Sequence, residues 1–239
     1  MSENTVTLQR YIPGWDLLDL CPFCFKVEVY LKLAAIPYAT VLADPRKAPK
    51  RKLPVLVDGS QTIPDSVAII DHLERTRGAP LDAFLSARQH AIATAVRSMV
   101  EEHLDFVVLY QRWQLDENWP LYRLKFIELA TLYGTPRFIA SLVMPSLRGK
   151  VLRILDCQGM GRHQPDEVVA IALRLFETLA ELCEGPFFFG ARPSTLDATV
   201  YAFLQSFAGV PFEGPVKDFV CTNATLRSYR EHVMRAIGT

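Results

Sequence analysis

The chain has 239 residues, of which 50% are hydrophobic and 22% charged, so it can bury a sizeable core and is not disordered as a whole. Its 26 basic and 26 acidic residues cancel, which removes the usual electrostatic argument for binding nucleic acid. Five cysteines, an odd number in a chain this long, are typical of a reducing compartment. No basic segment followed by an apolar core opens the chain, and residues 126–147 carry charges and prolines. We therefore expect a cytoplasmic protein with no membrane span.

The first third of the chain alternates between strand and helix signals. β-branched and apolar runs predict strands, helical spacing of apolar residues predicts helices, and Asp58-Gly59 predicts a hairpin turn between the last two strands. The expected strands cover residues 6–12, 38–42, 55–57 and 61–63, and the expected helices cover residues 21–35 and 66–75. This order predicts an α/β layer with a small mixed sheet.

Strand signals almost vanish in the rest of the chain. Residues 76–81 contain a glycine and a proline and indicate a connection. Helical periodicity then covers residues 84–113, 121–133, 138–155, 165–183 and 196–207. The pattern predicts two domains, an α/β domain over residues 1–77 and an all-helical domain over residues 84–239.

The sharpest local feature is Cys21-Pro22-Phe23-Cys24, between a predicted strand and a predicted helix. Pro22 suits the first position of a helix, which makes Cys21 the N-cap. The unpaired backbone N–H groups and the positive end of the helix dipole would then favour thiolate over thiol at Cys21. Lys26 could add positive charge there. The alternative is that Cys21 is an inert cap.

Cys24 lies one turn inside the same helix. It could resolve a mixed disulfide formed at Cys21, or it could be a small core residue. A Cys-x-x-Cys zinc site needs a second close pair, and the sequence has none, so no metal is expected.

Three further features could serve a ligand or could be plain structure. Leu53-Pro54 opens a strand, and a turn there could offer the Leu53 backbone to a peptide-like ligand. Asp65 or Ser66 suits a helix N-cap, and a helix N-terminus also suits a carboxylate. The basic run that ends at Lys52 is either a solvated loop or a contact for a ligand carboxylate.

Four ring-bearing residues recur at helical spacing on the long helix predicted over residues 84–113. They are His103, Phe106, Tyr110 and Trp113. Such a stripe is more often core than pocket. Its members nearest to Cys21 are nevertheless our candidates for an apolar substrate pocket, with Tyr110 first, because a phenol can orient a substrate while its ring packs.

An ordered set of motifs resembles the glutathione S-transferase superfamily. C-P-F-C-F-K-V-E at 21–28, K-L-P-V-L at 52–56 and P-D-S at 64–66 are similar to its N-terminal domains, and more narrowly to the metaxin and failed-axon-connections branch with its bacterial relatives. E-E-H-L at 101–104, G-M-G-R-H at 159–163 and F-F-F-G-A-R-P-S-T-L-D-A at 187–198 resemble the C-terminal helices of that branch. The resemblance implies a thioredoxin-like domain followed by a helical bundle, and a homodimer.

The resemblance also implies how the separate features combine around glutathione. Leu53, before a cis Pro54, would pair its backbone with the cysteinyl part of the ligand, and Phe23 would line the site. Asp65 and Ser66 would hold the γ-glutamyl end, and Lys52 would reach the glycine carboxylate. Cys21 stands where many members of the branch have serine. A cysteine there resembles the glutaredoxin and omega-type arrangement, which favours mixed disulfides and reduction.

The leading functional hypothesis is a glutathione-dependent transferase or reductase that acts on a small hydrophobic electrophile or a glutathione mixed disulfide, with Cys21 as the reactive thiol. One alternative is a non-catalytic interaction module like the metaxins. Another is a dithiol oxidoreductase that uses Cys21 and Cys24 without glutathione. The identity of the electrophile cannot be predicted from the sequence.

Overall fold

Four strands form a sheet at the start of the chain, in a computed structural model that describes residues 5–77 and 80–238. They are β1 (Val6–Arg10), β2 (Tyr38–Leu42), β3 (Val55–Asp58) and β4 (Gln61–Pro64). The spatial order is β2-β1-β3-β4, with β1 parallel to β2 and antiparallel to β3, so Val6 lies opposite Tyr38 and Leu8 lies opposite Leu56. The predicted small mixed sheet is confirmed.

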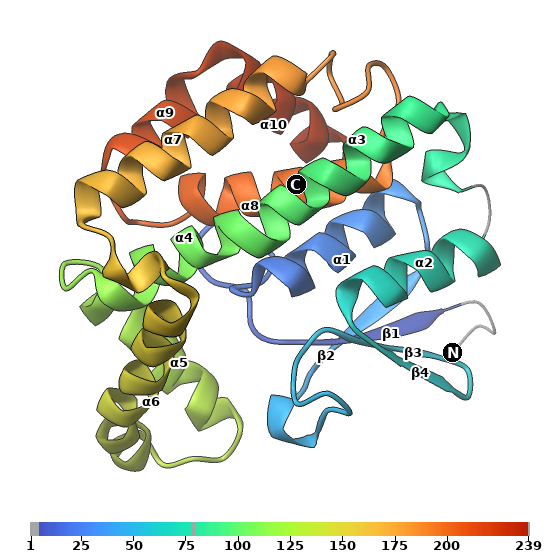
Figure 1. The fold of residues 1–239 in the computed structure, drawn as a ribbon. Helices are drawn as coiled ribbons and strands as arrows, with labels where there is room; N and C mark the ends of the chain where they lie inside the picture. The colour runs from blue at the N-terminus through green and yellow to red at the C-terminus, as the bar shows by residue number, and fades with distance from the viewer. Residues whose placement is uncertain (1–4, 78–79, 239) are drawn as a thin grey trace.

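Two helices, α1 (Pro22–Leu33) and α2 (Ser66–Thr76), pack together against this sheet (Figure 1). Pro22 occupies the first turn of α1, where its missing N–H is not needed. At the start of α2, Asp65 accepts hydrogen bonds from the backbone N–H groups of Val67 (3.0 Å) and Ala68 (3.3 Å). The capping residues visible in the sequence therefore begin both helices.

The rest of the described chain is almost entirely helical, as predicted. Its longer elements are α3 (Ala87–Ser98), a π-helix (Met99–Leu104), α4 (Asp105–Leu109), a second π-helix (Tyr110–Gln114), α5 (Trp119–Leu132), α6 (Arg137–Gln158), α7 (Pro165–Leu182), α8 (Thr195–Ala208), α9 (Pro215–Thr222) and α10 (Ala224–Ala236). Short 3₁₀ turns cover Pro45–Lys47, Leu81–Phe84 and Met160–Arg162.

The structure corrects two details of the sequence analysis. The single helix expected over residues 84–113 begins at Ala87 and is interrupted by two π-helical segments. Helices α9 and α10 were not predicted. Phe187 and Gly190 form an isolated β-bridge. Residues 78 and 79 of the expected connection lie outside the described residues, and the division into domains at residues 77 and 84 stays a prediction.

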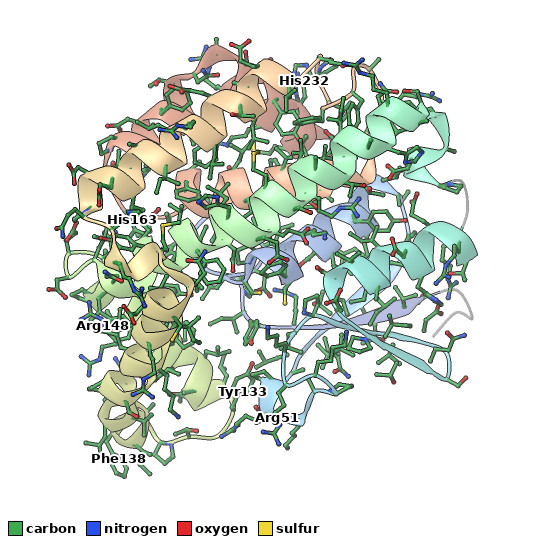
Figure 2. All side chains as sticks on the ribbon, viewed as in Figure 1. Arg51, Tyr133, Phe138, Arg148, His163 and His232 are labelled. Atoms are coloured by element: carbon green, nitrogen blue, oxygen red, sulfur yellow. The ribbon has the colours of Figure 1, made fainter. Side chains whose placement is uncertain are left out.

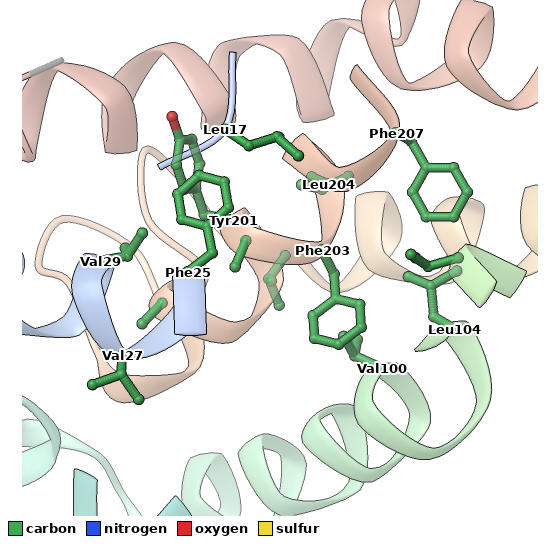
Figure 3. Packing of buried hydrophobic residues seen from close by; sticks show 14 of the residues in the cluster. Leu17, Phe25, Val27, Val29, Val100, Leu104, Tyr201, Phe203, Leu204 and Phe207 are labelled. Carbon is green, nitrogen blue, oxygen red and sulfur yellow. The ribbon is translucent and has the colours of Figure 1, made fainter. Parts of the chain in front are cut away.

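One hydrophobic core joins the two parts of the chain. Helix α8 is buried along nearly its whole length and packs on α1 (Figure 3). The Phe25 ring of α1 meets the Tyr201 ring of α8 edge to face, with 5.9 Å between the centroids, and Phe23 meets Phe203 in the same way at 5.6 Å. Because α1 is packed between the sheet and α8, its first turn has a fixed position.

Helices α5 and α6 form a hairpin that projects from the other helices (Figures 1 and 2). Several of its apolar side chains face outward, among them Phe138, which is 74% exposed, and Leu142, which is 79% exposed. Within the described residues, none of the helices is both long and apolar enough to span a membrane.

Candidate functional site

Cys21 is the N-cap of α1 and has extended backbone angles (φ −88°, ψ 119°). Its backbone N–H donates a hydrogen bond of 2.7 Å to Asp19 Oδ1, and its carbonyl accepts one of 2.9 Å from the Phe25 N–H. The side chain is half-buried and lines a cavity. Cys21 therefore lies at the start of the helix, as predicted, while the reactivity of its thiol stays a prediction.

The loop before Cys21 is held by a buried carboxyl group. Asp19 is fully buried, and Arg10 Nη1 lies 3.5 Å from its Oδ2. Burial raises the pKa of Asp19 to about 7, against the opposing effects of the Cys21 N–H and of Arg10. Nothing in the sequence pattern singled out this residue, because its burial depends on how the loop folds back.

Cys24 is fully buried beneath Cys21, in a small cluster with Leu53 and Val55. Burial, and then a hydrogen bond with the Cys21 side chain, raise the pKa of the Cys24 thiol well above its usual value. Cys24 is therefore a neutral thiol that can donate its S–H to Cys21. A resolving role would require Cys24 to become exposed.

Lys26 points away from Cys21, contrary to the sequence expectation. Its ammonium group lies 2.5 Å from Glu101 Oε1 and 3.4 Å from Ser66 Oγ, and the side chain is buried. Burial lowers the pKa of Lys26, and the attraction to Glu101 opposes this. The Lys26–Glu101 pair links the first helix to the helical region instead of activating the thiol.

All six residues predicted to bind glutathione line one cavity of about 360 Å³, called here the polar cavity. They are Phe23, Lys52, Leu53, Pro54, Asp65 and Ser66. The Leu53–Pro54 peptide bond is cis, and the Pro54 carbonyl accepts a hydrogen bond of 3.4 Å from the Asp65 N–H. Residues far apart in the sequence therefore meet at the start of α2.

Asp65 has φ 87°, a conformation that non-glycine residues adopt at a cost of about 1–3 kcal/mol. The conformation keeps its carboxylate exposed at the cavity while Oδ1 caps α2. Such strain is found preferentially at binding sites.

Charges of both signs line the polar cavity. Lys50 and Lys52 are the basic residues among its lining residues, and the helical region adds Glu101, Glu102 and Asp105 to Asp65. This distribution suits an extended ligand that carries both carboxylate and ammonium groups. These three acidic residues were missed as site residues, although Glu101 and Glu102 fall in the E-E-H-L motif.

A second cavity of about 230 Å³, called here the apolar cavity, contains Cys21. It shares Phe23 and Asp105 with the polar cavity, so the two are adjacent. Most of the residues that line it are apolar or aromatic, and Trp113 is among them. Tyr11, which follows β1, also lines it, and burial raises the pKa of its phenol. The arrangement can hold a small apolar molecule beside the Cys21 sulfur.

Only part of the expected aromatic stripe reaches this site. Trp113 lines the apolar cavity and Phe106 lines the polar cavity. His103 is exposed and lines neither of them. Tyr110 lines a different cavity of about 200 Å³, where its hydroxyl donates a hydrogen bond of 3.3 Å to the His163 carbonyl.

The structure therefore places neither His103 nor Tyr110 in the cavity that contains Cys21. The predicted stripe requires continuous α-helical spacing, and each π-helical turn contains an extra residue that rotates the following side chains. Asp105, Leu109 and Arg112 line the apolar cavity from this segment. The described residues contain no group of three or more His, Cys, Asp or Glu side chains that could hold a metal ion.

Comparison with known proteins identifies relatives of both parts of the chain. Residues 22–119 match the family model of the glutathione S-transferase N-terminal domain, and residues 172–233 match that of the glutathione S-transferase C-terminal domain. An isoprene-epoxide–glutathione S-transferase of Rhodococcus sp. is 32% identical over 96% of this chain and 98% of its own length.

Other relatives are longer than this chain. The failed axon connections protein of Drosophila melanogaster is 27% identical over 85% of this chain, which spans about half of that protein (51%). Metaxin-1 of Sus scrofa is 26% identical over 80% of this chain and 62% of its own length.

Solved structures share the fold at low sequence identity. Glutaredoxin 2 of Salmonella typhimurium in complex with glutathione has a TM-score of 0.56, with 18% identity over 98% of this chain and 95% of that one. Apo glutathione S-transferase III has a TM-score of 0.59, with 16% identity over 96% and 91%. The predicted thioredoxin-like domain with a helical second part is confirmed.

Proposed function

Because the chain belongs to the glutathione S-transferase family, we propose that it binds glutathione in the polar cavity and uses Cys21 as its reactive thiol. The substrates would be a small hydrophobic electrophile or a glutathione mixed disulfide. The observation that supports this most strongly is the meeting of six expected ligand residues in one cavity that adjoins the cavity of Cys21.

The charges of the polar cavity suggest an orientation for glutathione. Lys52 would bind the glycine carboxylate, and Asp65 with Ser66 would hold the γ-glutamyl end at the start of α2, with Asp65 facing the ammonium group. The Leu53 backbone would pair with the cysteinyl part. This orientation brings the glutathione sulfur toward Phe23, at the boundary with the apolar cavity.

With a mixed disulfide as substrate, the chemistry takes two exchanges at Cys21. The Cys21 thiolate attacks the glutathione sulfur, the S–S bond breaks, and the released thiolate takes a proton from water. A second glutathione thiolate then attacks the Cys21 mixed disulfide and leaves as glutathione disulfide, which regenerates the Cys21 thiolate. The S–H of buried Cys24 would stabilise that thiolate by a hydrogen bond.

The experiment is reduction of a glutathione mixed disulfide by the wild-type protein and three serine variants. Cys21→Ser should abolish turnover and remove the trapped glutathionyl adduct seen by mass spectrometry. Cys157→Ser, at an exposed position on α6, is the matched control and should behave as wild type. Cys24→Ser should retain turnover, whereas loss of turnover with Cys24→Ser alone would favour the dithiol mechanism.

A second candidate function is a non-catalytic interaction module, for which the exposed apolar side chains of α5 and α6 are the specific observation. Phe138, labelled in Figure 2, and Leu142 lie on α6 and line neither cavity. Wild-type binding of a partner protein that is lost in Leu142→Ser, together with no glutathione binding, would favour this candidate.

We also propose that the chain is cytoplasmic, because its odd cysteine count is typical of a reducing compartment, and that it forms a homodimer, as its family resemblance implies.

A further inference from the structure

Most of the exposed apolar side chains belong to the hairpin of α5 and α6. Twelve large apolar side chains are exposed among the described residues, and eight of these lie on the two helices. The most exposed are Phe138 (74%) and Leu142 (79%), both near the start of α6. An apolar surface of this kind marks an interaction with a protein or a membrane.

One side of α6 combines apolar and basic side chains. We call it the outer face and define it by the exposed residues Phe138, Leu142, Val143, Lys150, Arg153 and Ile154. Residues four, seven or eleven positions apart in a helix lie on the same side, as Leu142 and Arg153 do. The opposite side is buried and contains Ala140, Met144 and Leu155.

The hairpin packs without using its outer face. Ile127 of α5 forms a small separate core with Ala140 and Met144 of α6. Tyr133, at the end of α5, donates a hydrogen bond of 2.6 Å to the Ala43 carbonyl, and Arg148 donates one of 2.7 Å to the Trp113 carbonyl. These contacts fix the hairpin and leave the outer face free for a partner.

The outer face is basic, although the chain as a whole is neutral. Helices α5 and α6 contain six basic and two acidic residues, whereas the whole chain has 26 of each. Both acids, Glu128 and Asp156, are already paired with cations at 3.0 Å. Lys150 and Arg153 are exposed and have no ion-pair partner within the part of the chain that the structure describes. Their charges are therefore available to an anionic partner.

These features favour an anionic membrane surface over a second copy of the chain. A helix side with large apolar and basic residues suits the boundary of headgroups and acyl chains, where the apolar side chains enter by about 5–10 Å. Phe138 lies at the far end of the projecting hairpin (Figure 2), where a flat surface can reach it. A second copy related by a two-fold axis would instead add the same unpaired cations, and the acids of the hairpin are already paired.

We propose that the outer face of α6 docks the protein on membranes that contain anionic phospholipid. Phe138 and Leu142 enter the acyl-chain boundary, and Lys150 and Arg153 lie at the lipid phosphates. The contact is peripheral and reversible, because it depends on a few side chains and involves no membrane span. It is independent of the chemistry proposed for Cys21.

The test is flotation of the purified full-length protein with lipid vesicles on a density gradient. Vesicles of phosphatidylcholine and phosphatidylglycerol in equal parts should carry the wild type upward, and vesicles of phosphatidylcholine alone should bind it at least about 10-fold more weakly. Salt at about 0.5 M should release the protein from the anionic vesicles, because it screens the attraction between the cations and the phosphates.

Matched variants separate the two parts of the contact. Lys150→Gln should weaken binding to the anionic vesicles by about 5-fold, whereas Arg174→Gln, at an exposed position on α7, should bind as wild type. Leu142→Ser should weaken binding by about 10-fold, whereas Leu182→Ser, at the partly exposed end of α7, should not. Thermal melts should show all four variants folded, because each replaced side chain is exposed.

Three results would overturn the inference. The first is equal binding of the wild type to both kinds of vesicle, and the second is binding to neither. The third is unchanged binding of both Lys150→Gln and Leu142→Ser. If no vesicles bind and Leu142→Ser converts a dimer into single chains in light scattering, the face is an interface between copies. If no vesicles bind but poly-L-glutamate does, the face takes an acidic protein.

The vesicle assay also separates this inference from the proposed function. Binding to anionic vesicles by a protein that shows no glutathione binding in calorimetry would support the membrane contact and contradict the proposed function. Glutathione binding by a protein that fails to float with either kind of vesicle would do the reverse.

Discussion

Replacing Asp19 by asparagine tests how the loop before Cys21 is held. Asp19→Asn keeps an Oδ1 acceptor for the Cys21 N–H, whose hydrogen bond is 2.7 Å long in the wild type, and removes the ionisable group. Burial raises the pKa of this carboxyl from 3.8 to about 7. Between these values the folded protein keeps a proton that the unfolded chain has released, so stability falls as the pH rises through this window.

The magnitude follows from the two pKa values. The raised pKa lowers the free energy of unfolding by about 4 kcal/mol as the pH rises from the range where both states are protonated to the range where both are ionised. About 3 kcal/mol of this loss falls between pH 5 and pH 8. In a protein of this size, each kcal/mol changes the melting temperature by about 2–4 °C. Asp105, whose pKa is raised to about 6, titrates in the same direction in both proteins and cancels in their difference.

The assay is urea unfolding of wild type and Asp19→Asn at pH 5 and pH 8. From pH 5 to pH 8, the free energy of unfolding of the wild type should fall by about 3 kcal/mol more than that of the variant. Asp71→Asn, at an exposed position on α2, is the control and should keep the wild-type pH dependence. Equal pH dependence of wild type and Asp19→Asn would refute the reasoning, because it would mean that the carboxyl titrates normally in the folded protein.

Two further predictions follow from the packing and a third from the proposed assembly. Tyr110→Phe should leave turnover unchanged in a steady-state assay, because the Tyr110 ring is buried outside the site. Tyr110→Ala should lower the free energy of unfolding in urea by about 3 kcal/mol. Altered kinetics of Tyr110→Phe would instead place Tyr110 in the substrate pocket. Glu101→Gln should cost about 3–5 kcal/mol by leaving buried Lys26 unpaired, and adding Lys26→Met should recover most of that loss in a double-mutant cycle. Light scattering should give twice the chain mass of 27 kDa, and a single chain mass would exclude the proposed homodimer.

The elements of the α/β layer could be predicted because their signals are local. Alternating apolar residues mark β1, and the Asp58-Gly59 turn marks the hairpin of β3 and β4. Pro22 marks the start of α1. Each of these features depends on residues within a few positions of one another.

The details of the site that were missed depend on tertiary structure. The π-helical turns shift the lining residues of the apolar cavity to Asp105 and Arg112, and no sequence periodicity revealed this shift. Asp19 and Lys26 acquire their buried states from contacts with distant segments. The ligand set of the polar cavity was anticipated only through the family resemblance, since its residues become neighbours only when β3, α1 and α2 pack together.

Calorimetry of glutathione binding tests the central claim most directly. The account predicts saturable binding by the wild type, weakened at least about 10-fold by Asp65→Ala, because the Asp65 carboxylate at the polar cavity would meet the ligand's ammonium group. Asp65 also caps α2, so a thermal melt of the variant must first show that it is folded. Lys47→Ala, at an exposed position that does not line the polar cavity, is the control and should bind as wild type. No heat of binding at millimolar glutathione with folded wild-type protein would contradict the account.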